Sequence, residues 1–145
     1  MVSEIVAVKL NTTPKIVRGE RWFHTKRPIV VADAEPQIRK LIKRVLTNQG
    51  FTVFEAEDGL EAFATICQLH GEISILISDI DMPYLDGASL CKKVKDRFPS
   101  VPVLLMSANP EPRCNVGDVF LRKPSQMHLL SRVVADFCLE STQVA

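Results

Sequence analysis

The chain has 145 residues, of which 46% are hydrophobic, and a formal net charge of +1. A chain of this size can bury a substantial core as one compact domain without disulfides. The small net charge does not point to a nucleic-acid partner, and we expect no direct DNA binding. The apolar runs are too short to cross a bilayer and the N-terminus lacks a secretory signal, so we expect a cytoplasmic protein without a membrane partner.

The cysteines argue against two kinds of site. They are widely spaced, with no Cys-x-x-Cys pair and no histidine set at ligand spacing, which disfavours a zinc site and a redox motif. We expect reduced thiols at Cys67, Cys91, Cys114 and Cys138.

Residues 1–27 form a basic arm. The alternation of Val6, Val8 and Leu10 allows a short strand there. Two interpretations stay open: the arm docks on the domain or on a partner, or it is a disordered leader. We place a single domain at residues 28–141. The charged residues of the arm are Lys9, Lys15, Arg18, Arg21, Lys26 and Arg27, against Glu4 and Glu20.

From residue 28, short apolar runs alternate with amphipathic stretches. This alternation predicts a doubly wound α/β fold with a parallel sheet. The expected elements, in chain order, are a strand at 29–32, a helix opening at Glu35-Pro36, a strand at 51–56, a helix at 60–69, a strand at 73–78, a helix at 88–98, strands at 101–107 and 119–122, and a helix capped by Ser125.

The first helix has both ends marked. Pro36 stands at its first position, where a missing N–H costs nothing, and Gly50 ends it. We expect its basic face to meet solvent or an acidic partner. The apolar face carries Ile38, Leu41, Ile42, Val45 and Leu46, and the basic face carries Arg39, Lys40, Lys43 and Arg44.

The connection between the last two strands is unusually short. Residues 109–118 contain two prolines and a glycine, so they hold at most a single helical turn, although a parallel crossover usually contains a helix. We expect the sheet face beneath to be thinly shielded, and the N-terminal arm or a second copy of the chain, in a homodimer, to cover it.

Four of the apolar runs end in polar residues. Asp79 follows the run 73–78, Asp33 and Glu35 follow 29–32, and Ser107 and Lys123 end the last two runs. Because parallel strands present their carboxyl ends at one edge, these side chains should converge where α/β sheets bind ligands. Asp79 there could attack phosphorus, hold a cation, or merely solvate the strand end.

The ordered set of motifs resembles the receiver domains of bacterial response regulators. The motifs are Ile29-Val30-Val31-Ala32-Asp33-Ala34-Glu35-Pro36, then Asp79-x-x-Met82-Pro83-x-x-Asp86-Gly87, Ser107-Ala108, and Phe120-Leu121-Arg122-Lys123-Pro124. The resemblance covers about residues 28–140. It implies a five-stranded sheet in the order 2-1-3-4-5 with five helices, and a single-domain receiver in a two-component phosphorelay.

The resemblance also implies roles for individual residues. Asp79 would accept a phosphoryl group from a sensor histidine kinase or a phosphotransfer protein, and the chain would then switch its contacts with a downstream protein. Any enzyme activity would be limited to self-phosphorylation and self-dephosphorylation. Mg²⁺ would be bound by Asp33, Asp79 and the backbone carbonyl of Asp81. Lys123 and Ser107 would contact the phosphoryl oxygens, Phe120 would be the switch aromatic, and the Lys123-Pro124 bond would be cis.

One position departs from the family pattern. The family usually has two adjacent acids after the first strand, and here the second is Ala34. We expect Mg²⁺ binding weakened by about ten- to a thousandfold. A receiver-like interaction module independent of phosphorylation is the alternative. A haloacid-dehalogenase-type phosphatase is a third interpretation, because Asp79-Ile80-Asp81 matches its paired aspartates, but Pro83 stands where that family has Thr or Val.

Overall fold

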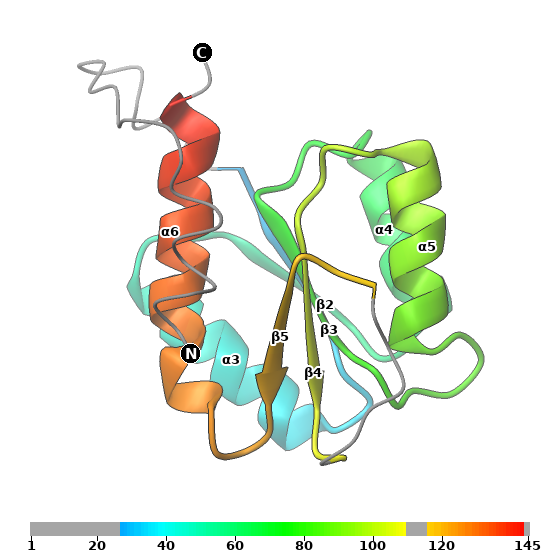
Figure 1. The fold of residues 1–145 in the computed structure, drawn as a ribbon, viewed down its shortest axis with the longest axis horizontal. Helices are drawn as coiled ribbons and strands as arrows, with labels where there is room; N and C mark the ends of the chain where they lie inside the picture. The colour runs from blue at the N-terminus through cyan, green and yellow to red at the C-terminus, as the bar shows by residue number, and fades with distance from the viewer. Residues whose placement is uncertain (1–26, 110–115, 144–145) are drawn as a thin grey trace.

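The computed structural model describes residues 27–109 and 116–143, with side chains as far as Cys138. The sequence-based expectations for residues 1–26, including the arm and its strand, lie outside this part. The elements are β1 (Ile29–Ala32), α3 (Pro36–Asn48), β2 (Val53–Ala56), α4 (Gly59–Gln68), β3 (Ile75–Asp79), α5 (Gly87–Arg97), β4 (Val103–Ser107), β5 (Val119–Arg122), the 3-10 turn η1 (Met127–Leu129) and α6 (Leu130–Gln143) (Figure 1).

The strands form one parallel sheet in the order β2-β1-β3-β4-β5, which confirms the predicted topology. Helices α3 and α6 cover one face, and α4 and α5 cover the other (Figure 1). Four α-helices lie in the described residues, against the five that the resemblance implies, and the described part of the crossover from β4 to β5 contains none.

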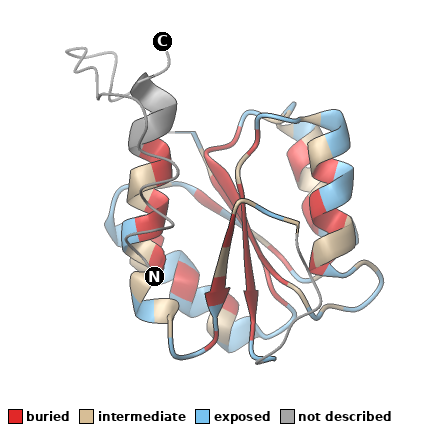
Figure 2. Cartoon of the chain, viewed as in Figure 1, coloured by how far each residue is buried: buried red, intermediate tan, exposed pale blue. Residues whose placement is uncertain are grey.

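The core has two halves, one on each side of the sheet. In β1, Ile29 and Val31 face α3 and α6, whereas Val30 and Ala32 face α4 and α5. All four are fully buried, and Figure 2 shows the strands of the sheet largely in the colour of buried residues. Burial on both faces explains why the strand sequences are continuously apolar rather than alternating.

Side-chain caps set two of the helix starts. Asp58 Oδ1 accepts the Glu61 N–H (2.8 Å) at α4, and Asp86 Oδ1 accepts the Ser89 N–H (2.7 Å) at α5. The prediction that Ser125 caps the last helix is wrong, because η1 intervenes and the preceding Gln126 makes no side-chain cap bond. Pro36 opens α3 as predicted.

Two residues of α3 are placed differently from the prediction. Leu41, expected in the core, is 46% exposed, and Arg39, expected on the solvent face, is buried. Arg39 lies three residues before Ile42 and seven before Leu46, so it shares their buried face. Leu41 lies at the margin of that face.

The sheet face under the short crossover is not open, contrary to expectation. Val103 and Leu105 are buried, and Val116 and Phe120 pack against their cluster. Gly117 has φ +96°, and a Cβ there would lie 3.1 Å from Leu105 Cδ1, so the chain lies directly on the sheet. The apolar surface that an arm or a second copy was expected to cover is therefore absent among these residues. No described helix is long and apolar enough to span a membrane.

Candidate functional site

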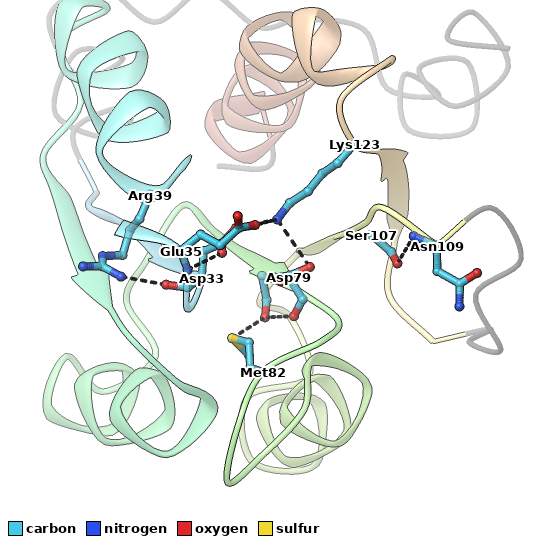
Figure 3. A network of polar contacts seen from close by, with 9 residues as sticks. Asp33, Glu35, Arg39, Asp79, Met82, Ser107, Asn109 and Lys123 are labelled. Carbon is cyan, nitrogen blue, oxygen red and sulfur yellow. Dashed lines mark hydrogen bonds and ion pairs between the residues drawn. The ribbon is translucent and has the colours of Figure 1, made fainter. Parts of the chain in front are cut away.

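Four buried polar side chains lie along the carboxyl edge of the sheet. Asp33 follows β1, Asp79 and Ser107 end β3 and β4, and Lys123 follows β5 (Figure 3). They come from four different strands, as the predicted parallel sheet requires. Burial of two acids and a lysine together means that their charges interact strongly.

Lys123 links the acidic groups. Its Nζ lies 2.8 Å from Asp33 Oδ2, 3.5 Å from Asp79 Oδ1 and 3.7 Å from Glu35 Oε1 (Figure 3). Burial alone would lower the pKa of Lys123, but the hydrogen bond to Asp33 and the charges of Asp79, Asp33 and Glu35 outweigh it and raise the pKa. Lys123 is therefore protonated at neutral pH. The Lys123-Pro124 bond is cis.

The Asp79 carboxyl has a raised pKa. Burial raises this pKa most, and the charge of Lys123 lowers it. The negative charges of Asp33 and Asp81 raise the pKa further, and a hydrogen bond from the Asp81 backbone lowers it. Together they raise the pKa of Asp79 from 3.8 to about 6. Above that pH the site holds an ionised carboxylate whose charge Lys123 offsets only from 3.5 Å.

The loop after β1 is held by Arg39, which sequence reasoning missed. Arg39 Nη1 donates to the Asp33 backbone carbonyl (2.7 Å), and its Nε donates to Glu55 Oε1 on β2 (2.8 Å). Asp33 Oδ1 accepts the Glu35 N–H (2.9 Å). These bonds fix the Asp33 carboxylate toward Lys123. The signal available in the sequence was the helical spacing of Arg39 from Ile42.

The loop after β3 is held against Asp79 by Gly87. A Cβ on Gly87 would lie 2.2 Å from the Asp79 carbonyl oxygen, so only glycine permits this approach. The Gly87 N–H donates to the Ile80 carbonyl (2.8 Å), and Ser78 Oγ donates to the Asp79 carbonyl (2.8 Å). The start of α5 therefore packs on the backbone that carries the candidate acceptor.

The remaining predicted site residues lie apart from the lysine network. Ser107 Oγ accepts the Asn109 N–H (3.0 Å) (Figure 3). Phe120 is partly buried and packs against the core half under α4 and α5. Asp81 has an exposed side chain, and its backbone contributes to the Asp79 environment.

The donor set fits a magnesium ion that retains most of its water. Mg²⁺ in proteins is commonly held by one or two carboxylates, with waters completing the octahedron, and Asp33, Asp79 and the Asp81 carbonyl are oxygen donors of this kind. Both Asp33 oxygens are already hydrogen-bonded, and Ala34 offers none. Within the described ranges, no group of three acidic, histidine or cysteine side chains could hold a metal by itself.

Comparisons with known proteins agree with the fold. The family model of the response regulator receiver domain matches residues 29–133. Sensor protein EvgS of Escherichia coli O157:H7 is 29% identical over 94% of this chain, which spans only 12% of EvgS. The receiver domain of the hybrid histidine kinase CckA is 32% identical, with 77% of this chain and 98% of that one covered and a TM-score of 0.66. The response regulator TrrA of Thermotoga maritima, solved with Mg²⁺ and BeF, is 26% identical, with 77% and 98% covered and a TM-score of 0.67.

Proposed function

Because the chain belongs to the response regulator receiver domain family, we propose that it accepts a phosphoryl group on Asp79 from a histidine kinase or a phosphotransfer protein. The observation that carries this proposal is the Lys123 ammonium, held 2.8 Å from Asp33 and 3.5 Å from Asp79. A buried cation next to a buried carboxylate stabilises the charge that develops on phosphoryl oxygens during transfer.

In the proposed reaction, an Asp79 carboxylate oxygen attacks the phosphorus of a phosphohistidine. A P–O bond forms, the P–N bond breaks, and the imidazole nitrogen leaves with the electron pair and takes a proton from solvent. Lys123 turns from Asp33 toward a phosphoryl oxygen, and the Ser107 hydroxyl donates to another. When bound by Asp33, Asp79 and the Asp81 carbonyl, Mg²⁺ supplies further positive charge to the phosphoryl oxygens. We propose that this binding is weakened because Ala34 replaces an acid.

Phosphorylation would act through a population shift. Contacts from Ser107 and Lys123 to the phosphoryl group favour one of two arrangements of their loops, and Phe120 would move inward as Ser107 moves. Receiver domains as a class bind kinases, phosphotransfer proteins and downstream proteins. For this chain, the shifted loops would change the affinity for its downstream partner.

A second candidate function is an interaction module that works without phosphate. Ala34 favours it, because the loop after β1 carries one buried acid, and both oxygens of that acid are hydrogen-bonded already. In such a module Lys123 and Asp33 would serve as a structural ion pair, and the partner would bind one fixed shape.

Intact-protein mass spectrometry after incubation with acetyl phosphate separates the two functions. The phosphoacceptor function predicts an adduct that requires Asp79 and increases with Mg²⁺, that is lost in Asp79→Asn, and that survives in the exposed control Asp96→Asn. No adduct on the native chain at high Mg²⁺, with an adduct on Ala34→Asp, would support the phosphate-independent module instead.

A further inference from the structure

Two exposed apolar side chains lie on neighbouring segments, Tyr84 on the loop between β3 and α5 and Leu60 in the first turn of α4. Tyr84 is 83% exposed and Leu60 is 54% exposed. A Cβ on Gly59 would lie 2.3 Å from the Leu85 carbonyl oxygen, so the first residue of α4 packs directly on the loop between β3 and α5. Leu60 and Tyr84 therefore belong to two segments in contact, and this loop projects from the carboxyl edge of the sheet (Figures 1 and 2).

Folding does not account for the tyrosine at position 84. Its φ of +68° is a left-handed conformation that strains any residue except glycine, and asparagine and aspartate to a smaller extent. The side chain recovers little of this strain through burial, whereas the next residue, Leu85, packs into the core. A bulky aromatic side chain at a strained, exposed position contributes little to folding stability, which favours a role in binding a partner.

The two segments that carry these side chains are acidic. Neither residues 57–61 nor residues 81–86 include a lysine, arginine or histidine. Hydrogen bonds to backbone N–H groups fix several of the carboxylates, including those of Glu61 and Asp86. We define the Tyr84 patch as the side chains of Leu60 and Tyr84 with their exposed acidic rim, Glu57, Glu61, Asp81 and Asp86.

The position of the Tyr84 patch relative to Asp79 indicates which kind of protein binds it. A protein that delivers a phosphoryl group must bring phosphorus to the Asp79 carboxylate, and residues 80–86 leave directly from that residue and return to it at Gly87. Such a protein therefore covers this loop. We propose that the Tyr84 patch is a docking surface for the phosphodonor protein, which receives Tyr84 and Leu60 in an apolar depression ringed by basic side chains.

The inference rests on the proposed function, so its test compares a small donor with a protein donor. Acetyl phosphate is the small donor. The protein donor is the ATP-autophosphorylated histidine kinase of the source organism that labels the native chain fastest. Tyr84→Gly and Leu60→Gln in the full chain should accept phosphate from acetyl phosphate at the native rate and lose about tenfold or more in kcat/KM with the kinase.

Three further variants and one control test the contributions of folding, of charge and of a competing surface. Tyr84→Asn, which tolerates the left-handed backbone better than tyrosine, should show the same loss with a melting temperature no lower than that of the native chain. Glu57→Gln should weaken kinase transfer more than the exposed control Glu72→Gln does. Leu41→Gln tests a competing surface, because Leu41 lines an apolar cleft of about 290 Å³ between α3 and α6.

Native kinase rates in the patch variants would overturn the docking proposal, as would a loss in Leu41→Gln alone. Labelling of the native chain by acetyl phosphate but by no kinase would overturn the docking proposal and leave the phosphoacceptor function intact. Labelling by neither donor would overturn both.

Discussion

Replacing Asp79 by asparagine should stabilise the metal-free chain at neutral pH. Burial, with the charges of Asp33 and Asp81, raises the pKa of Asp79 from 3.8 to about 6, so ionisation is harder in the folded chain than in the unfolded one. The difference corresponds to about 3 kcal/mol of unfolding free energy, at about 1.4 kcal/mol per pH unit. Asparagine has nearly the shape of the protonated acid and carries no such penalty.

The sign of the pH dependence follows from the same two values. Below pH 3.8 the carboxyl is protonated in both states and the penalty is absent, and above pH 6 the penalty is complete. The stability gap between Asp79→Asn and the native chain should therefore open between these values and then stay constant.

Urea unfolding followed by circular dichroism, in EDTA buffers from pH 4 to pH 8, measures this gap. Asp96→Asn on the exposed side of α5 is the matched control and should show little gap at any pH. Groups that titrate in both proteins cancel in the difference. Equal stability of Asp79→Asn and the native chain at pH 7.5 would refute the conclusion that burial destabilises the ionised form of Asp79. A stability gap that fails to close toward pH 4 would refute it as well.

Three further predictions concern the residues around Asp79. Ala34→Asp should raise Mg²⁺ affinity by about ten- to a thousandfold in isothermal titration calorimetry, with Ala34→Asn as the uncharged control. Gly87→Ala should lower the unfolding free energy by about 1–3 kcal/mol and slow acetyl phosphate labelling, because its Cβ would meet the Asp79 backbone. Arg39→Gln should cost about 1–3 kcal/mol by leaving the Asp33 carbonyl and the Glu55 carboxylate underbonded. Lys43→Gln, which removes the half-exposed partner of the same Glu55, should cost less than about 1 kcal/mol.

The fold could be predicted because its signals are local and repeated. Apolar runs long enough for buried strands alternate with amphipathic stretches, and this alternation leaves a parallel sheet as the main solution. The strand order came from the resemblance, since hydrophobic patterns do not specify neighbours. The apolar runs predict strand starts two residues early at β2, β3 and β4, because apolar residues continue into the loops that lead to these strands.

The sequence also predicts that the polar side chains of the site lie together, but it does not predict which of them form ion pairs. The strand ends bring Asp33, Asp79 and Lys123 to one edge, as parallel topology requires. That Lys123 lies closer to Asp33 than to Asp79 depends on the conformation of a long side chain and on the hydrogen bonds that aim Asp33. The charge of Arg39 predicts a solvent-facing position, but its helical spacing from Ile42 and Leu46 places it on the buried face of α3.

The alanine at position 34 changes the net charge of the site and therefore changes which phosphorylation state binds Mg²⁺ better. Asp33, Asp79 and Lys123 together carry one negative charge when ionised, so a divalent cation overcompensates them. An aspartyl phosphate carries a charge of about −2, and the phosphorylated site would hold two negative charges, which Mg²⁺ would match. A second acid at position 34 would move this match to the unphosphorylated state. The alanine should therefore make Mg²⁺ prefer the phosphorylated chain, and because coupling between two ligands is reciprocal, Mg²⁺ should in turn shift the phosphorylation equilibrium toward the phosphorylated chain.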